Sequence, residues 1–292
     1  MKTVSSGLWF PDADIFLPGE MGTHTREAIR EDVPPHHSES VVRRTPPQPT
    51  EEERRLGTPE LIFKPENRVR VNDTRVYPYS AVCGLLVINR NQNAYYGTGF
   101  LAAPRLVITA GHNVYYHGDG FMEKIYVYPG LNGDRRNPVF PAAETRLFYS
   151  VEAWVLDQNR DFDLGAIILP TPLGDYAGWF SVSRFTTQTL DSLTVTVSGY
   201  PHTPPVESSP GTTQWHDVSR IDVESNRLRH WADTSIGQSG SPVFAYFPDK
   251  PNKYHVVGVH NWGYDAENVA TRINEAVFAQ IAAWRKMSEQ IR

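Results

Sequence analysis

From about residue 70, the chain consists of short apolar or alternating runs that are separated by Gly, Pro, Asn and Asp. Such runs, rich in β-branched residues and bounded by turn residues, are typical of the strands of a β-sandwich or β-barrel. The clearest runs are AVCGLLVI, GTGFLAA, LVITAG, KIYVYPG, LGAIILP, LTVTVSGY, SPVFAYF and HVVGVHNW. The pattern therefore predicts an all-β body.

The C-terminal segment RINEAVFAQIAAWRKMSEQIR has a different period. Its apolar side chains recur at Ile273, Val277, Ile281 and Trp284. This spacing places them on one face of an α-helix. We therefore expect a single amphipathic helix over about residues 273–290 that closes the all-β body.

The first 61 residues show no sustained period of 2 or 3.6. They contain many prolines and the charged run EEERR at 51–55. A segment of this kind buries little apolar surface, which predicts a largely irregular, Pro-rich N-terminal extension over 1–61 before a domain over 62–292. Apolar residues near its start, such as Trp9 and Phe10, leave open that the extension docks on the domain or on a partner.

Composition and charge narrow the range of partners. Of the 292 residues 40% are apolar, and the net charge is -5. Residues 1–60 hold 11 acidic and 7 basic residues, so this segment carries -4 of the net charge of -5. No basic surface is expected on the domain, which argues against a nucleic-acid ligand. No apolar run approaches the ~18 residues of a membrane-spanning helix, so no membrane span is predicted.

Cysteine use and the N-terminus bear on the compartment. Cys83 is the single cysteine, so no disulfide can form within the chain, and its apolar surroundings predict burial. Proline and acidic residues interrupt the first twenty residues, where a secretory signal needs a continuous apolar stretch. These features fit a reducing compartment, although a non-standard export route would leave the same pattern.

The stretch GQSGSPVF, residues 237–244, places Ser239 in a glycine-containing turn before a strand. A serine nucleophile needs a base, a carboxylate that orients the base, and backbone N–H groups that bind the oxyanion. Glycine permits positive φ and close backbone approach, which can aim the N–H groups of Gly237 and Ser239 at one point. Taken alone, a serine in such a turn is more often structural, so the assignment depends on partners elsewhere.

Candidate partners come earlier in the chain. His112, in LVITAGHNVYY, would stand at the end of an apolar strand. The stretch DFDLGAIILP offers Asp161 and Asp163, which alternation places on the same face, so periodicity cannot choose between them. Singly, such residues are usually capping or solvated groups, but the order His, Asp, Ser over an all-β body is far less expected by chance. The other histidines, including His230, show no metal-ligand spacing, and we expect packing or solvated roles for them and no metal site.

Seven motifs carry a resemblance to a known family, in that family's order: ENRVRVNDTRVYPYSAV, ITAGHNVY, DFDLGAI, VTVSGYP, DTSIGQSGSPVF, VVGVHNWG and ATRINEAVF. Through them, roughly residues 62–285 resemble the glutamyl endopeptidases, a bacterial branch of the chymotrypsin-like serine proteases. The resemblance implies two six-stranded antiparallel β-barrels, over about 70–168 and 169–270, with the active site in the cleft between them. The family pattern of Asp, one residue, then a small residue also selects Asp163 over Asp161.

The resemblance implies a serine endopeptidase that cleaves protein or peptide substrates without a cofactor. Its catalytic triad would be His112, Asp163 and Ser239, with an acyl-enzyme intermediate and an oxyanion hole made by the N–H groups of Gly237 and Ser239. Two alternatives remain open. One is a trypsin-like serine protease of broader specificity, and the other is a non-catalytic module that binds acidic peptides on the same scaffold.

Specificity is also implied by the family, in which a histidine and a Thr or Ser together hold a substrate carboxylate. The matching residues here are His260 and Thr234. A buried carboxylate must be hydrogen bonded, and an imidazole and a hydroxyl supply donors without a permanent buried cation in the empty pocket. We therefore expect preference for Glu before the scissile bond, and then for Asp, whose carboxylate lies one methylene short.

The usual mature start of the family aligns near Ile62. Cleavage after Glu60 would leave Leu61 as the new terminus, one residue longer than that start. Residues 1–61 are thus expected to be either a pro-segment whose removal raises activity or a permanent docking or regulatory arm. We expect a monomer.

Overall fold

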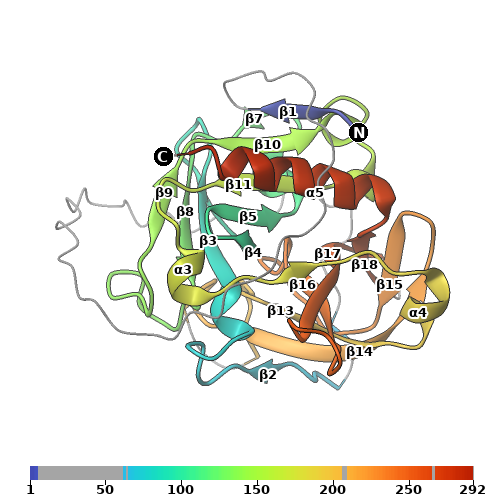
Figure 1. The fold of residues 1–292 in the computed structure, drawn as a ribbon. Coiled ribbons are helices and arrows are strands. Elements are labelled where there is room, and N and C mark those ends of the chain that lie inside the picture. Colours follow the sequence, from blue (N-terminus) through green and yellow to red (C-terminus); the bar gives the residue numbers. More distant parts are fainter. Residues whose placement is uncertain (6–61, 64, 206–208, 265–266, 292) are drawn as a thin grey trace.

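The computed structural model describes residues 1–5, 62–63, 65–205, 209–264 and 267–291. They form two large, mainly antiparallel sheets and one long helix at the C-terminal end (Figure 1). The predicted all-β body with a C-terminal helix is confirmed.

The first sheet consists of eight strands, most of them from the first half of the chain. They are β1 (Thr3–Ser5), β3 (Val82–Ile88), β4 (Ala94–Ala103), β5 (Leu106–Thr109), β8 (Lys124–Pro129), β9 (Ala143–Thr145), β10 (Phe148–Val151) and β11 (Gly165–Ile168). Their order is β1-β10-β11-β5-β4-β3-β8-β9. Every residue of β5 and β11 is buried, which is why these strands read as continuous apolar runs in the sequence. A separate ribbon joins β6 (Tyr115–Tyr116) and β7 (Gly120–Phe121).

The second sheet closes on itself. Its ring strands are β13 (Thr194–Gly199), β14 (Trp215–Val223), β15 (Arg227–His230), β16 (Pro242–Tyr246), β17 (Tyr254–Tyr264) and β18 (Glu267–Arg272). They follow the order β17-β16-β13-β14-β15-β18, and β18 pairs back with β17, which makes the six-stranded barrel that was predicted. Two short strands attach to this barrel, β12 (Ser181–Val182) at β17 and β2 (Val69–Arg70) at β14.

The strand count of the first half differs from the six that were expected. Its sheet has eight strands because β1 and β9 add to its two edges. β1 comes from the predicted extension and pairs antiparallel with β10, and Glu152 N–H donates to the Lys2 carbonyl at 2.9 Å. Residues 6–61, with Trp9 and Phe10, lie outside the described residues, so the irregular character of the extension stays a prediction.

Short helical turns occupy the connections between strands. They are η1 (Tyr79–Ala81), α2 (Glu152–Val155), η2 (Gly111–Asn113), η3 (Arg160–Phe162), α3 (Gly174–Ala177) and α4 (Thr187–Asp191). Two of these turns, η2 and η3, carry or directly precede candidate catalytic residues.

Helix α5 (Glu275–Ser288) ends the chain and matches the predicted helix. The side chain of Asn274 caps it by accepting the Val277 N–H at 3.0 Å. Its predicted apolar face is buried in the same core as the first sheet, where the helix contacts β4, β5 and β11 and runs in front of β11 in Figure 1. The segment that follows the second barrel thus returns to cover the first sheet, and this ties the two halves together.

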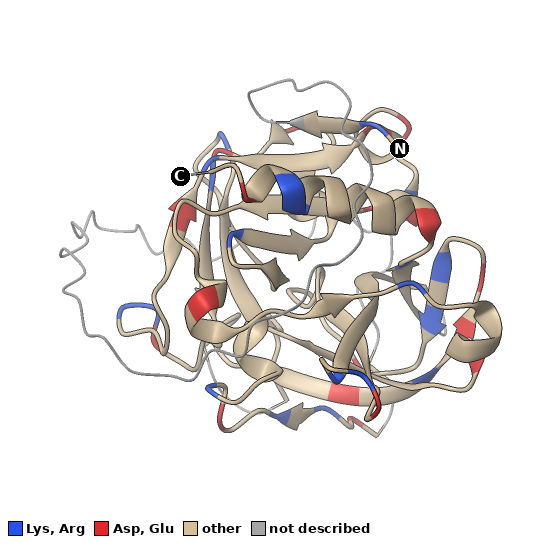
Figure 2. Cartoon of the chain, viewed as in Figure 1, with Lys and Arg blue, Asp and Glu red and all other residues tan. Residues whose placement is uncertain are grey.

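Three predictions from composition concern Cys83, membrane-spanning helices and the distribution of charged residues. Cys83 is buried, and burial raises the pKa of its thiol. Among the residues that the structure describes, no helix is long and apolar enough to cross a membrane. Basic and acidic residues are interspersed over both sheets in the view of Figure 2.

Candidate active site

His112 and Asp163 lie at adjacent ends of two paired strands. β5 leads into η2, which contains His112, and Asp163 follows η3 just before β11. The two strands are antiparallel, with Thr109 opposite Gly165. The exit of one strand therefore lies beside the entry of the other, and the imidazole and the carboxylate come together.

Asp163 holds His112 at two points. Its Oδ2 lies 2.7 Å from Nδ1 of the imidazole, and its Oδ1 accepts the backbone N–H of His112 at 2.8 Å. The side chain of Asp163 is fully buried, whereas that of His112 is 16% exposed. Gly111 permits this approach, because a Cβ there would lie 2.8 Å from Asp163 Oδ1. The bond at Nδ1 favours the tautomer whose Nε2 can act as a base.

Asp161, the other carboxylate in this stretch, has a different partner. It forms an ion pair with Arg227 of β15. The two aspartates that alternation left equivalent are therefore separated by their contacts, and Asp163 is the one that contacts His112.

Two glycines shape the turn that carries Ser239. Gly237 and Gly240 have φ values of 98° and 91°, in the left-handed region that favours glycine. A Cβ at Gly240 would lie 2.0 Å from the Thr98 carbonyl oxygen, and one at Gly237 would lie 2.7 Å from that of Tyr200. The glycines of GQSGSP are thus required for both the conformation and the close approach of this turn.

Ser239 comes from the second barrel and meets the first sheet beside His112. Its carbonyl oxygen accepts a hydrogen bond at 2.9 Å from Nδ2 of Asn113, the residue that directly follows His112. Ser239 Oγ lies 3.4 Å from the carbonyl oxygen of Asn261, and Asn261 Nδ2 donates to the Asp163 carbonyl at 3.2 Å. The three candidate triad residues are therefore brought to one place between the two halves.

The candidate oxyanion donors, the N–H groups of Gly237 and Ser239, lie on either side of Gln238. The turn is closed by Gln238 N–H, which donates to the Ser235 carbonyl at 3.0 Å, and by Ser241 N–H, which donates to the Gln238 carbonyl at 2.9 Å. Within the described part of the chain, the Gly237 N–H has no protein acceptor. An uncommitted backbone donor beside the serine is what binding of an oxyanion requires.

The two candidate specificity residues are both fully buried near the same turn. The backbone of His260, on β17, accepts from Gly240 N–H at 2.7 Å and donates to the Ser241 carbonyl at 2.9 Å. Thr234 lies in the loop that leads to Ser239, and its hydroxyl has no hydrogen-bond partner among the described residues. Buried hydroxyls are normally satisfied, so this one marks a candidate contact for a ligand.

His260 also has a neighbour that the sequence did not reveal. Its Nδ1 lies 3.1 Å from Nε2 of the buried His230 on β15. Burial lowers the pKa of His230 to about 3. Burial, followed by repulsion from His230 and His112, holds the pKa of His260 well below its usual range. We expected only packing or solvation for His230, because its partner lies on a strand that no local pattern connects to it.

Two tryptophans border the candidate base. The rings of His112 and Trp262 are 5.0 Å apart, and the ring of Trp154 is 6.4 Å from that of His112. The guanidinium of Arg160 lies over Trp262 at 5.0 Å. These aromatic side chains limit the positions of the imidazole. Trp262 lies in the motif VVGVHNWG, whereas no motif linked Trp154 to the candidate site.

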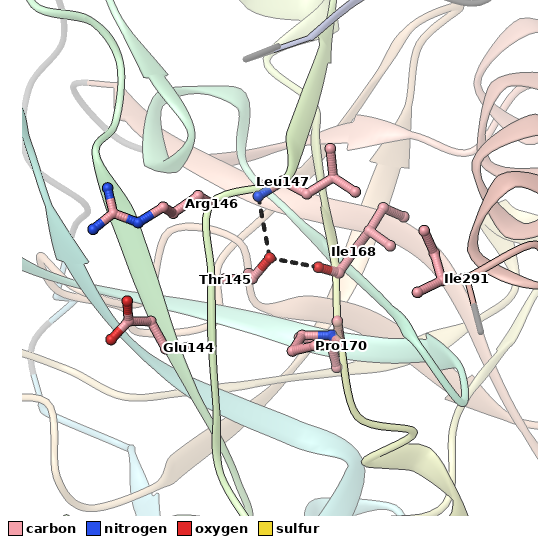
Figure 3. A pocket seen from close by; sticks show the side chains of 8 residues that line it. Glu144, Thr145, Arg146, Leu147, Ile168, Pro170 and Ile291 are labelled. Atoms are coloured by element: carbon pink, nitrogen blue, oxygen red, sulfur yellow. Dashed lines mark hydrogen bonds between the residues drawn. The ribbon is translucent and has the colours of Figure 1, made fainter. Parts of the chain in front are cut away.

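The described residues contain no candidate metal site, and a cavity lies apart from the candidate triad. No group of three His, Cys, Asp or Glu side chains among them could hold a metal ion. A cavity of about 340 Å³ lies at the end of β11 opposite Asp163, beside Ile291 (Figure 3). There the Thr145 hydroxyl donates to the Ile168 carbonyl at 2.7 Å and accepts from Leu147 N–H at 3.1 Å, so these polar groups satisfy one another.

Comparisons with known proteins cover the same region. The trypsin family matches residues 71–285, a range that contains every candidate site residue. A glutamyl endopeptidase from Bacillus licheniformis is 34% identical over 78% of this chain and 70% of its own. A protein from Bacillus subtilis named extracellular metalloprotease is 32% identical over 80% of this chain and 74% of its own. A solved structure of a Glu endopeptidase in complex with MPD has a TM-score of 0.66 and 26% identity, and the match covers 77% of this chain and 100% of that one.

Proposed function

This chain belongs to the trypsin family and is a glutamyl endopeptidase-like serine endopeptidase of the chymotrypsin fold, and on that premise we propose that His112, Asp163 and Ser239 form its catalytic triad. The observation that carries the proposal is the two-point contact of Asp163 with His112, at 2.7 and 2.8 Å, beside the turn of Ser239. In this arrangement the carboxylate of Asp163 orients the imidazole of His112, and the imidazole can act as the base for Ser239.

The first half of the reaction forms an acyl-enzyme. Ser239 Oγ attacks the carbonyl carbon of the scissile peptide, and its proton passes to Nε2 of His112. Asp163 stays ionised and stabilises the imidazolium through Nδ1. The oxyanion that develops accepts hydrogen bonds from the N–H groups of Gly237 and Ser239, each worth about 3 kcal/mol in comparable sites. The tetrahedral intermediate then breaks its C–N bond as His112 returns the proton to the leaving amine.

The second half of the reaction releases the product acid. Water attacks the ester carbonyl and gives a proton to His112, the same backbone donors hold the second oxyanion, and Ser239 leaves with that proton. These steps use only side chains and backbone groups of this chain. The acid product carries the residue that occupied the specificity pocket.

We further propose that Thr234 and His260 bind the side-chain carboxylate of that residue and thereby favour Glu, with Asp second. The support is the burial of both side chains and the unsatisfied Thr234 hydroxyl within the described residues. Because the pKa of His260 is low, the empty pocket holds a neutral imidazole and incurs no cost for a buried charge. An entering carboxylate favours the protonated imidazole, which adds a charge-assisted hydrogen bond only when the correct substrate is present.

The test of this proposal is hydrolysis of a peptide panel that differs only in the residue before the scissile bond: Glu, Asp, Gln, Lys or Phe. We expect the fastest cleavage after Glu, and its loss in Ser239→Ala. The matched control is Ser192→Ala, at the exposed C-terminal end of α4, which should cleave like the wild type. Hydrolysis that persists in Ser239→Ala would refute the triad, whereas equal rates on Glu and Lys peptides would support the broader-specificity alternative.

The role of residues 1–61 is a separate proposal. We infer that cleavage after Glu60 removes residues 1–60 as a pro-segment and leaves Leu61 at the new terminus, because the region matched to the trypsin family begins at residue 71 and leaves these residues out. Intact-mass measurement of the purified wild type and of Ser239→Ala tests this inference. A shortened wild type beside an intact Ser239→Ala chain would indicate self-processing, and an active wild-type chain that stays intact would count against a pro-segment.

A further inference from the structure

A buried arginine contacts the loop that leads to Ser239. The side chain of Arg68 is 1% exposed, and the residue directly precedes β2. Its Nη1 donates to Ser235 Oγ at 2.8 Å and to Gln238 Oε1 at 3.0 Å. Its Nε and Nη2 each donate to the carboxylate of Glu66 at 2.8 Å. One guanidinium therefore joins the start of the domain to the loop that carries the proposed nucleophile.

The contact of Arg68 with Gln238 can affect the reaction because Gln238 lies between the two proposed oxyanion donors. Peptide units are planar, so the backbone dihedrals of Gly237 and Gln238 together set how the N–H groups of Gly237 and Ser239 point relative to each other. The side chain of Gln238 folds back on the turn, and its Oε1 also accepts the Ser235 N–H at 3.1 Å. Arg68 thus donates to both Ser235 and Gln238, the two residues whose hydrogen bond closes the turn.

The segment that carries Arg68 is itself fixed on the second barrel. The carboxylate of Asp233 accepts the backbone N–H groups of Phe63 and Asn67, the latter at 2.6 Å. β2, which follows directly, pairs antiparallel with β14. Arg68 therefore reaches the serine turn from a backbone with little freedom to move.

Stability alone is a weak explanation for such a residue. Only the arginine of the Arg68–Glu66 pair is buried, since the Glu66 side chain is 30% exposed. The desolvation of the guanidinium offsets much of this attraction, and a hydrophobic side chain of similar volume often serves as well. A planar guanidinium supplies something different, namely several N–H donors in fixed relative directions. That property suits a residue whose task is to fix the shape of a polar turn.

We propose that Arg68 is a positioning residue that, through Gln238 and Ser235, keeps the N–H groups of Gly237 and Ser239 directed at the oxyanion. The inference rests on the proposed function, in which Ser239 is the nucleophile. Arg68 touches neither substrate nor oxyanion in this role. Its removal should therefore act on the transition state and leave ground-state binding in the specificity pocket unchanged.

The main test is Arg68→Met, which keeps much of the side-chain length and removes every donor. We expect kcat on a Glu peptide to fall about 10- to 100-fold, because small displacements of oxyanion donors are costly, while KM stays within about 3-fold. A fluorophosphonate supplies the second readout. Ser239 Oγ forms a bond to phosphorus, fluoride leaves and His112 takes the hydroxyl proton, and the phosphoryl oxygen occupies the same hole. The rate of this labelling should fall by a factor similar to that of kcat.

Matched variants separate positioning from folding. Arg70→Met changes an exposed arginine two residues along, whose Nη2 donates to Asn132 Oδ1 at 3.3 Å, and it should behave like the wild type. Arg68→Lys and Gln238→Met each remove part of the contact and serve if Arg68→Met does not fold. Substitutions at Arg68 and at Gln238 disrupt the same contact between the two side chains. A double variant that combines Arg68→Lys with Gln238→Met should therefore have a kcat little lower than that of the worse single variant.

The outcomes distinguish this inference from the function on which it rests. Wild-type labelling and hydrolysis that are lost in Ser239→Ala, together with a selective loss of kcat in the Arg68 variants, would support both. Folded Arg68 variants with wild-type kcat and labelling rate would overturn the inference alone, as would a rise in KM with kcat unchanged. A wild-type protein that is neither labelled nor active would overturn the proposed function and this inference with it.

Discussion

At the residue scale, the imidazole of His112 depends on a single carboxylate for its orientation and its charge balance. In Asp163→Asn, the amide keeps the shape of the side chain but cannot hold the proton on Nδ1 in the same way. We expect kcat on a Glu peptide to fall about 10⁴-fold, as in other serine-protease triads that lose this carboxylate. Asp161→Asn is the matched control, because Asp161 pairs with Arg227 and should matter little for turnover. A loss in Asp163→Asn no larger than that of the control would contradict the triad.

Thr234 offers a residue-scale test of specificity. Thr234→Val keeps the shape of the side chain and removes the buried hydroxyl that the described residues leave unsatisfied. A hydrogen bond to a charged group is worth about 1.5 to 3 kcal/mol, so kcat/KM for a Glu peptide should fall about 10- to 150-fold. The loss for the matching Gln peptide should be smaller, because its side chain carries no charge.

The control for that experiment is Thr194→Val, on an exposed position of β13, which should leave both substrates unaffected. If Thr234→Val lowered kcat/KM for the Glu and Gln peptides by the same factor, the hydroxyl would have a structural role and the proposed carboxylate contact would be wrong.

The candidate residues differ in how far the sequence could predict them. Ser239 and His112 stand in local turns whose small residues mark them. Asp163 needed the family resemblance, since alternation treats it like Asp161. The contacts of Arg68 could not be predicted, because its partner Gln238 lies 170 positions away in the sequence. No local sequence pattern indicates that the two residues are in contact.

At the element scale, the strands that the sequence predicted are those with enough buried residues to form a pattern. Both β5 and β11 are buried throughout and read as apolar runs. α5 is long enough, at 14 residues, for its 3.6-residue period to be visible. By contrast β2, β6, β7 and β12 have two residues each, too few for any period, and are defined only by the strands they pair with.

The buried His230–His260 pair leads to a prediction about pH, because the two rings meet across β18, which pairs with both β15 and β17. Burial lowers the pKa of His230 to about 3, below the 6.5 of an unfolded histidine. Between those values the unfolded chain binds a proton that the folded chain does not, so stability is lost as pH falls below about 6.5. The contribution is about 1.4 kcal/mol per pH unit for each such imidazole.

We therefore expect His230→Phe to weaken the dependence of the unfolding free energy on pH. Urea unfolding between pH 6 and pH 4 should give a slope that is smaller than the wild-type slope by about 1.4 kcal/mol per pH unit. Comparison of slopes removes the shared contribution of the carboxylates. Parallel wild-type and variant slopes would mean that His230 is protonated in the folded protein as readily as in the unfolded one.

At the scale of the whole molecule, the candidate site exists only where the two halves meet. The first sheet supplies His112 and Asp163, and the second barrel supplies Ser239. Helix α5 adds to the joint, because it follows the second barrel in the chain but buries its apolar face in the core of the first sheet. Such an assembly could be foreseen from the order of the motifs, whereas the eight-stranded first sheet could not, since its edge strand β1 comes from a segment with no strand pattern.

The position of the groups that fix the serine turn allows a prediction about the full chain. The contacts of Phe63, Asn67 and Arg68 with the loop from Asp233 to Gln238 all involve residues after position 61. Removal of residues 1–61 should therefore leave the oxyanion donors in place. It should also remove the β1–β10 pairing, so that β10 becomes an edge strand and the melting temperature falls.

The measurement compares a chain that begins at Ile62 with a full-length Glu60→Gln chain, in which cleavage after residue 60 is blocked. We expect equal rates of labelling by a small fluorophosphonate, because labelling reports the assembled triad and oxyanion turn. Any gain on truncation should instead appear in kcat/KM for a long protein substrate, as expected if residues 1–61 restrict access. A full-length chain that labels far more slowly than the truncated one would mean that the turn is assembled only after cleavage. The contacts of Phe63, Asn67 and Arg68 would then be insufficient to hold it.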